Sequence, residues 1–597
     1  MAQNFEEILH PVEFYRDELR ARHHEHTVAA FDEFFRRSGV DADANAKLVA
    51  QIRKLEEKVA HLGARRRRWS LLRWLCILLG LAGWGALAGF FLSGPRWPLP
   101  VPIAGAAAGV LFPVLIFAWI NPRIKVLDRN IAREEALLKE KTDEAWKQME
   151  PLNRLYQWDT IAKLVMKTLP VVAVDSYFSG IRLEQLTGHF GWSGTVGENM
   201  SVLACQSGAL NGNPWCIGEA LQQVWKPETY TGTLNISWQE RETYTDSNGK
   251  TQSRWVTRHQ TLTATVTKPK PDYLNRKYLI YGNEAAPDLT FSREPNPVSE
   301  VSGSFLGRRK LKNAVQALEK KSRNLKDGFV IMDNREFDAC FNAVDRDHQV
   351  QFRMLYTPLA QQETLKLLRD REVGYGDDFS FRKDHMINIL ESSHLNRTEI
   401  SAAPELFRTY DLSEAGRRFT EFSDEFFRSF YFSVAPLLCI PLYQEYRSTL
   451  DVYKGVIDTG EPAFYEYEAL ANALNDGVFA PAGAATQSIL KTEVSSSEDE
   501  AASVAVTAHA FRGEERVEYV PKYGGDGKWH DVPVHWIEYL PVSRQRTMTV
   551  CRTGIHDTGD FAEAARREEW KEFAARHNIP KHGVCFRRSL AAFVAKS

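Results

Sequence analysis

The sequence has few cysteines, almost no net charge and no apolar stretch at its start. Its seven cysteines contain no CxxC pair and are widely spaced, which is typical of a reducing compartment rather than of a secreted, disulfide-stapled fold. With 75 basic and 77 acidic residues, the chain has no basic excess that would indicate a nucleic-acid partner. The first residues are polar and acidic, so we expect no cleavable signal peptide.

Short motifs of nucleotide binding and hydrolysis are also missing. The chain contains no GxxxxGK[ST], GxGxxG, HExxH or GxSxG sequence. Carboxylates gather at Asp345 and Asp347, at Asp377 and Asp378, and at Asp384, but these positions read as loop residues. We therefore assign no catalytic residue and no cofactor, and the sequence favours a binding protein over an enzyme.

Two long hydrophobic runs are present, close together. Residues 74–92 (WLCILLGLAGWGALAGFFL) and 103–120 (IAGAAAGVLFPVLIFAWI) contain no charged residue. At about 1.5 Å per residue, each run approximates the ~30 Å thickness of the hydrocarbon layer, so we expect two membrane helices joined as a hairpin. Because neither run holds an ionisable residue, we expect an anchor and not a transport path. The alternative is a pair of buried core helices.

Charged residues beside the two runs predict their orientation. Basic residues concentrate before the first run and after the second, whereas the Pro-rich connector carries only Arg96. By the positive-inside rule, both ends of the chain are expected in the cytoplasm. The residues that determine this topology are Arg65, Arg66, Arg67, Arg68, Arg123 and Lys125.

Each run contains a GxxxG pattern, which lets helix backbones approach closely. The first pattern is Gly85 and Gly89, and the second is Gly105 and Gly109. We expect these glycines to pack the two runs against each other. Self-association of the protein is the alternative.

Amphipathic stripes flank both runs and predict helices that extend the hairpin into an antiparallel stalk. The stripe before the first run is Leu48, Ile52, Leu55, Val59 and Leu62. The looser stripe after the second run is Leu127, Ile131, Leu138, Ala145 and Met149.

Beyond about residue 156 the pattern becomes mixed α/β. Residues 231–238 and 255–267 alternate between apolar and polar and flank Asn248-Gly249, which predicts a β-hairpin with long arms. Residues 502–550 are β-rich, with a turn near GGDGK, but the likeness of the two hairpins is too weak to establish a repeat. The apolar stretch 426–443 is too short for a third span and predicts a buried core or interfacial segment.

One set of residues could bind a metal. Two thiolates and two imidazoles could form a tetrahedral zinc site from Cys551, His556, His582 and Cys585. The alternative is two buried cysteines and two surface histidines. A second cluster, at positions 23, 24 and 26, consists of three histidines and predicts a solvated helix face.

The segment 333–368, DNREFDACFNAVDRDHQVQFRMLYTPLAQQETLKLL, resembles bacterial membrane proteins of domain-of-unknown-function family 3137. The matching positions are Glu336, Phe337, Phe341, Asp345, Asp347, Thr357 and Pro358, followed by 379–381 and 387–389. Ala343 and Tyr356 depart from the Val and Leu that are usual there. The resemblance implies a two-helix hairpin in the bacterial inner membrane before an α/β cytoplasmic domain, and it implies no activity.

These observations predict a membrane-anchored α+β protein with a two-helix transmembrane hairpin, a helical stalk and mixed α/β cytoplasmic domains. The expected regions are an N-terminal amphipathic helical region (1–63), the hairpin (64–122), the stalk (123–168), an α/β domain (169–399) and a C-terminal α+β region (400–597). We expect a membrane-anchored scaffold or binding/sensor protein whose partners are the lipid bilayer and a protein or a second copy. The alternatives are a membrane-bound enzyme with a non-contiguous site and an oligomeric membrane effector.

Overall fold

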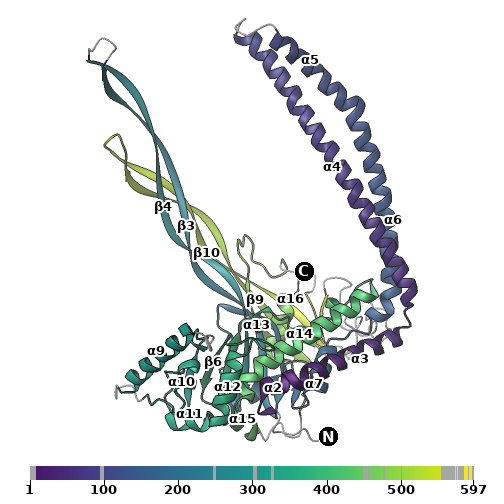
Figure 1. The fold of residues 1–597 in the computed structure, drawn as a ribbon, viewed down its shortest axis with the longest axis vertical. Coiled ribbons are helices and arrows are strands. Elements are labelled where there is room, and N and C mark those ends of the chain that lie inside the picture. The colour runs from purple at the N-terminus through teal and green to yellow at the C-terminus, as the bar shows by residue number, and fades with distance from the viewer. Residues whose placement is uncertain are drawn as a thin grey trace. The chain divides into compact units, whose positions relative to one another are not determined.

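The structure is a computed structural model, and it shows a mixed α+β chain (Figure 1). It describes all residues except 1–7, 94–99, 246–250, 300–304, 324–328, 448–454, 458–459, 475–476, 499–500, 553–571, 573–574, 576–583, 589 and 595–597. The chain forms two compact units. Unit 1 comprises Met1–Thr27, Gln157–Pro404 and Phe422–Ser597, and unit 2 comprises Val28–Tyr156 and Glu405–Glu421.

Unit 2 is built on long helices. They are α4 (Ala42–Ser93), α5 (Pro100–Leu115), the π-helical turn η2 (Ile116–Ile120) and α6 (Asn121–Asn153), together with parts of α3 (Arg20–Ser38) and α14 (Leu412–Leu438). Helices α4 and α6 pack against each other, with Leu48 and Ile52 of α4 against Ala145 of α6. Residues of both predicted amphipathic stripes therefore meet in one small core, as expected for helices that return antiparallel.

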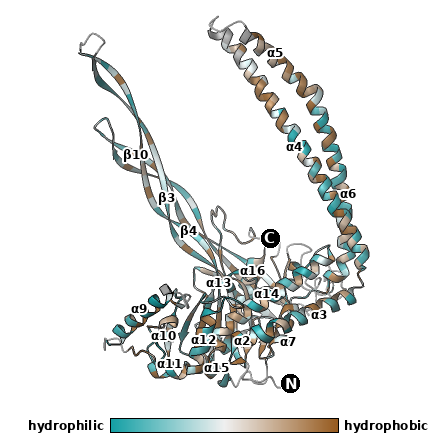
Figure 2. Cartoon of the chain, viewed as in Figure 1, coloured by the Kyte–Doolittle hydropathy of each residue, from teal (hydrophilic) through white to brown (hydrophobic). Residues whose placement is uncertain are grey.

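Two helices of the described chain are long enough and apolar enough to cross a membrane. They extend over Ala42–Gly89 and Ile103–Asn153, and their apolar windows are only 18% and 22% buried. The core helix of a soluble domain is mostly buried, whereas these two windows are mostly exposed. Figure 2 shows the hydrophobic residues gathered on α5 and on the adjoining part of α4.

Unit 1 contains two antiparallel sheets. The first has seven strands in the order β1-β2-β3-β4-β7-β6-β5, and the second has five in the order β11-β12-β10-β9-β8. The first comprises β1 (Val172–Val174), β2 (Met200–Leu210), β3 (Asn213–Thr245), β4 (Thr251–Gly282), β5 (Thr290–Arg293), β6 (Phe379–Asp384) and β7 (Ile387–Ser392). The second comprises β8 (Ile489–Glu498), β9 (Ala501–Tyr523), β10 (Trp529–Arg552), β11 (Val584–Arg587) and β12 (Leu590–Phe593).

Five strands of the first sheet have the same order as the five strands of the second. The order β2-β3-β4-β7-β6 in the first matches β8-β9-β10-β12-β11 in the second. In each, a long hairpin is followed by a short hairpin whose second strand pairs with the last residues of the long one. The turns of both short hairpins begin with a non-glycine residue in the left-handed region, His385 with φ 57° and Arg588 with φ 54°. The weak likeness of the two predicted hairpins thus corresponds to a shared strand order.

The two long hairpins pack on one another, as Figure 1 shows for β3, β4, β9 and β10. Their shared core contains Leu262, Ala264, Val266, Val532 and Val534. A side chain at Gly232 would place its Cβ 2.0 Å from the Pro533 carbonyl oxygen, so this close approach requires glycine. Both hairpins were predicted. The first has longer arms than predicted, and its Asn248-Gly249 turn lies outside the described residues.

Short helices cover the sheets of unit 1. They are α2 (Pro11–Phe14), η1 (Tyr15–Leu19), α7 (Thr160–Thr168), α8 (Gly180–Glu184), η3 (Gln185–His189), α9 (Phe305–Ser322), α10 (Arg335–Phe341), α11 (Gln349–Leu355), α12 (Pro358–Arg369), α13 (Ser393–Arg397), η5 (Pro404–Leu406), α15 (Pro441–Glu445) and α16 (Phe464–Ala473). Helix α16 lies between the sheets, because Tyr465 packs in the core of the first and Leu470 in the core of the second.

The segment 427–440, which includes the end of α14, is largely buried inside unit 1. Phe427 stacks beside Tyr15, and Phe430 lies against Trp215 at a ring-centroid distance of 5.5 Å. This apolar stretch is therefore core, as the prediction of a buried segment requires.

Candidate functional site

The apolar hairpin of α4 and α5 packs through a glycine of α4 that was not predicted. A Cβ at Gly83 would lie 2.8 Å from the Gly105 carbonyl oxygen, and one at Gly109 would lie 3.0 Å from Trp84 Nε1. A Cβ at Gly85 or Gly89 would meet no atom within 4 Å. Because residues two apart on a helix point about 200° apart, Gly85 faces away when Gly83 faces α5. Gly105 and Gly109 thus lie at the contact, whereas Gly85 does not.

The predicted topology determinants lie where α4 and α6 run side by side. The Arg123 guanidinium lies 4.3 Å from the Trp119 ring centroid and 4.9 Å from that of Trp69. Arg66 Nε pairs with Asp128 Oδ1 at 2.5 Å. Such cation–aromatic and ionic contacts tie the two helices together next to the apolar runs. Arg65, Arg67, Arg68 and Lys125 belong to the same flanks.

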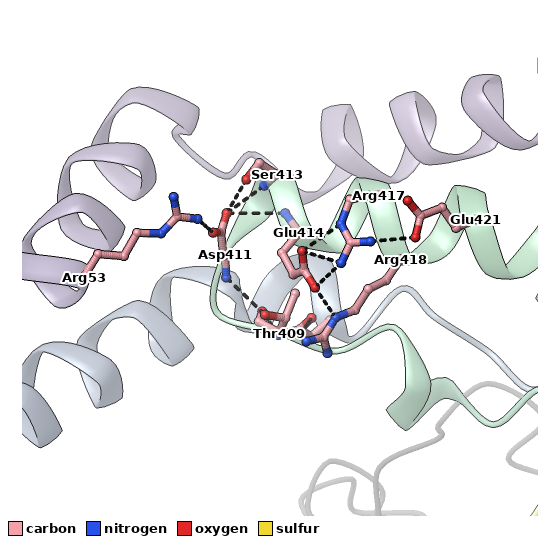
Figure 3. A network of polar contacts seen from close by, with 9 residues as sticks. Arg53, Thr409, Asp411, Ser413, Glu414, Arg417, Arg418 and Glu421 are labelled. Carbon is pink, nitrogen blue, oxygen red and sulfur yellow. Dashed lines mark hydrogen bonds and ion pairs between the residues drawn. The ribbon is translucent and has the colours of Figure 1, made fainter. Parts of the chain in front are cut away.

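A second charged network lies at the start of α14 in unit 2 (Figure 3). Asp411 accepts hydrogen bonds from the Ser413 backbone N–H and hydroxyl at 3.0 and 2.7 Å, and from Arg53 Nη2 at 2.8 Å. Hydrogen bonds from Arg417 and Arg418 lower the pKa of Glu414 to about 2. These contacts satisfy the first backbone donors of the helix and join it to α4, so the network is a structural junction.

The predicted zinc set is not brought together. Cys551 pairs with Ala591 and Cys585 with Ala592, both on β12, which lies between their strands. Directly paired residues share a face and consecutive residues alternate, so the two cysteines lie on opposite faces of the sheet. His556 and His582 lie outside the described residues. Within the described chain, no group of three or more His, Cys, Asp or Glu side chains could hold a metal ion.

The N-terminal histidines form a solvated face only in part, because His24 is exposed and His26 half-buried but His23 is buried. His23 is buried, with Nδ1 3.0 Å from Thr168 Oγ1 and Nε2 3.0 Å from Ser423 Oγ. His24 contacts Asp424 and His26 contacts Thr168. Sequence reasoning missed the burial of His23 because the positions beside it are polar.

One arrangement looks like a hydrolase triad. His394 Nδ1 lies 3.0 Å from Asp378 and Nε2 lies 3.1 Å from Ser433 Oγ. A nucleophilic serine needs an accessible oxygen beside donors for an oxyanion. Ser433 is buried within α14 and donates its hydroxyl to the Ser429 carbonyl oxygen at 2.7 Å. The three side chains therefore form a structural network.

The acidic residues that carried no assignment have structural partners. Asp347 accepts from the Thr290 backbone N–H at 2.8 Å, and Asp345 accepts from that of Ser292 at 2.9 Å. Asp377 forms a fully buried ion pair with Arg293 at 2.7 Å. These carboxylates fix β5 and the segments next to it.

The positions that carried the family resemblance build a core. The Phe337 and Phe341 rings stack at 5.3 Å, and Tyr356 lies 4.9 Å from Phe341. Thr357 caps α12 by accepting from the Ala360 backbone N–H, and Pro358 occupies its first turn.

Buried charges concentrate where the two sheets of unit 1 meet. Asp175, after β1, makes a bidentate pair with Arg182 of α8, with both distances 2.9 Å. Glu466 of α16 lies 3.3 Å from Arg587 Nε and 3.5 Å from Arg588 Nη1. Arg587 and Arg588, at the end of β11 in the second sheet, thus lie near charged side chains from α8, α16 and the segment after β1.

A cavity of about 210 Å³ opens beside this cluster. Its polar lining includes Asp159, Lys163, Asp175, Gln206 and Arg588. A second cavity of about 30 Å³ shares four of its lining residues and is otherwise mostly apolar. This arrangement could hold a small polar molecule against a buried cation.

No family model, curated protein or solved structure matches this chain. The cavity is therefore interpreted from its own chemistry. Sequence analysis missed it, although one signal was visible. Charged residues interrupt apolar stretches at Glu466 and Glu468 in FYEYEALA and at Arg587 and Arg588 in CFRRSLAAF. Such residues are rarely buried unless they are paired, but their partners cannot be read from the sequence.

Proposed function

We propose that this protein is a membrane-anchored binding protein. In this proposal the α4–α5 hairpin crosses the bacterial inner membrane twice, and both ends of the chain are cytoplasmic. The main support for this proposal is the apolar surface that the hairpin exposes. On that surface Leu78 is 62% exposed and Phe117 is 75% exposed. A contiguous apolar surface of this kind is stable only when lipid or another apolar partner covers it.

The charge pattern supports the orientation. Basic residues gather on the α4 and α6 sides of the hairpin, and Arg123 lies beside two tryptophans, as residues at a membrane interface do. The absence of ionisable residues from 74–92 and 103–120 supports anchoring over transport. The resemblance to domain-of-unknown-function family 3137 agrees with this layout.

Unit 1 would supply the binding function as a scaffold or sensor. The long hairpins expose large aromatic side chains at Trp255, Tyr519, Tyr523 and Trp529. Exposed aromatic residues on a long β-hairpin are candidate contacts for a protein partner. The buried charge cluster and its cavity would serve a small ligand.

Extraction and labelling of membranes test the anchor. The chain should stay in the pellet after alkaline carbonate and be released by detergent. In intact inner-membrane spheroplasts, an impermeant maleimide should label Arg96→Cys, in the connector, but not Lys58→Cys, on α4 before the first run. Lysis should make Lys58→Cys reactive. Release by carbonate would refute the anchor, and the opposite labelling order would refute the orientation.

A further inference from the structure

We propose that the cavity beside Arg588 binds a small oxyanion, that is, a molecule carrying a phosphate or carboxylate group. The inference names the ligand class of the binding protein proposed above. It rests on that binding function but not on the membrane anchor. Three features of the site support it, namely its charge balance, the geometry of Arg588 and the size of the cavity.

Among the described residues, the buried cluster has one more cation than anions. Asp175 and Arg182 neutralise each other, as do the paired Asp159 and Lys163 at the cavity wall. A single carboxylate, Glu466, serves two guanidinium groups. The described charged groups of the cluster and cavity wall are the cations Lys163, Arg182, Arg587 and Arg588 and the anions Asp159, Asp175 and Glu466, which leaves one net positive charge. An uncompensated buried charge is costly, and a bound anion would offset that cost.

Arg588 has unused donor capacity. Its side chain is only 10% exposed, and it donates from Nη2 to Gln206 Oε1. Nη1 has no hydrogen-bond partner among the described residues and lies 3.5 Å from Glu466 Oε1. Burial, only partly offset by Glu466, lowers the pKa of Arg588, as expected for a cation short of counter-charge. A guanidinium presents paired donors that suit phosphate and carboxylate oxygens.

The equivalent turn of the first sheet is an internal comparison. His385 begins that turn with nearly the same φ as Arg588, yet it is exposed, and its imidazole Nδ1 lies 2.8 Å from the carboxylate of the neighbouring Asp384. The shared turn geometry therefore does not require a buried cation. Burial of Arg588 is particular to the second copy, where the cavity lies.

The size of the cavity limits the ligand. About 210 Å³ is below the ~300–1,000 Å³ that is usual for drug-sized ligands, so the molecule would be small. The apolar cavity next to it offers only about 30 Å³, which leaves no room for an acyl chain. Ser176 and Lys163 at the wall add a hydroxyl and an ammonium donor. The structure thus favours a soluble anion over a lipid headgroup with its chains.

The test uses the full chain in detergent. Inorganic phosphate and succinate are titrated separately at constant ionic strength, with chloride as the control anion, while the thermal unfolding midpoint is recorded. We expect phosphate, succinate or both to raise the midpoint saturably by about 2–4 °C and chloride to have no effect. Arg588→Gln should abolish the rise. Arg512→Gln, which removes an exposed arginine of β9, should retain it.

A second variant keeps the test decisive if Arg588→Gln does not fold. Ser176→Asp places a carboxylate at the cavity wall, so it should raise the midpoint without added anion and abolish the response. No saturable response of the wild type to either anion would overturn the inference, as would a full response in Arg588→Gln or Ser176→Asp. Carbonate extraction reports separately on the anchor, so failure of one proposal is distinguishable from failure of the other.

Discussion

Acid should loosen the N-terminal helix through His23. This ring is buried against α7 and α14 and stacks on Phe427 at a centroid distance of 4.1 Å. Burial lowers the pKa of His23 from 6.5 to about 4. Between these two values the unfolded chain binds a proton that the folded chain excludes. The contribution of His23 to stability is therefore complete above pH 6.5 and is lost as the pH falls through 4.

The size of the effect follows from the two pKa values. His23 has a pKa of 6.5 in the unfolded chain and of about 4 in the folded chain. When the pH falls from about 7.5 to about 5, this difference lowers the free energy of unfolding by roughly 2 kcal/mol. Most of this loss falls below pH 6.5, where the unfolded imidazole becomes charged. The expected observation is a fall in unfolding midpoint with acidification and faster amide exchange in residues 20–27.

Matched variants isolate this contribution from other titrating groups. His23→Gln should be less stable at neutral pH, because it loses the ring stack, but should lose roughly 2 kcal/mol less than the wild type on acidification. His385→Gln, at an exposed histidine, should lose as much unfolding free energy on acidification as the wild type does. Chemical unfolding of the detergent-purified chain at both pH values measures the difference. An equal loss in wild type and His23→Gln would refute the reasoning.

Three further predictions concern close packing and buried charge. Gly83→Leu should lower the thermal unfolding midpoint of the detergent-purified chain, because the leucine side chain would collide with α5. Gly85→Leu should leave that midpoint unchanged. Equal effects of the two substitutions would contradict the contact between Gly83 and α5. Asp175→Asn should cost about 3–5 kcal/mol in chemical unfolding, because it leaves the charge of a buried guanidinium without its carboxylate, whereas Glu242→Gln, at an exposed ion pair, should cost far less. Gly232→Val should separate the two long hairpins, because the valine Cβ would lie 2.0 Å from a carbonyl oxygen of β10. We expect proteases to cleave β9–β10 faster in this variant than in the wild type. Cleavage at the wild-type rate would contradict the packing of the two hairpins.

The sequence predicted individual elements better than their pairing. The length of the two uncharged apolar runs identified the apolar parts of α4 and α5. The alternation of apolar and polar residues on either side of Asn248-Gly249 identified the β3–β4 hairpin. The pairing of β4 with β7 was not predictable, because the two strands are distant in the chain and a six-residue strand fits many edges. The shared strand order became visible only when both pairings were known.

Candidate sites were harder to predict because contact depends on which way a side chain faces. Gly105 and Gly109 of the second GxxxG lie against α4, but the spacing could not show that Gly83 and not Gly85 faces α5. The spacing of a motif shows which residues share one face of a helix. Which of its faces packs against the neighbouring helix depends on that neighbour. For the same reason, the sequence could not show that Cys551 and Cys585 lie on opposite sheet faces.

The shared topology also explains why an arginine at position 588 is informative. A left-handed φ costs a non-glycine residue about 1–3 kcal/mol, and glycine or asparagine would adopt it more easily. The first sheet places an exposed histidine at the equivalent position, so the backbone alone does not select a residue type there. The Arg588 side chain is nevertheless only 10% exposed, shares its counter-ion with Arg587 and lines a cavity. Because neither the turn nor the ion pair requires this residue, its unsatisfied donor is best explained by a ligand that completes its hydrogen bonds.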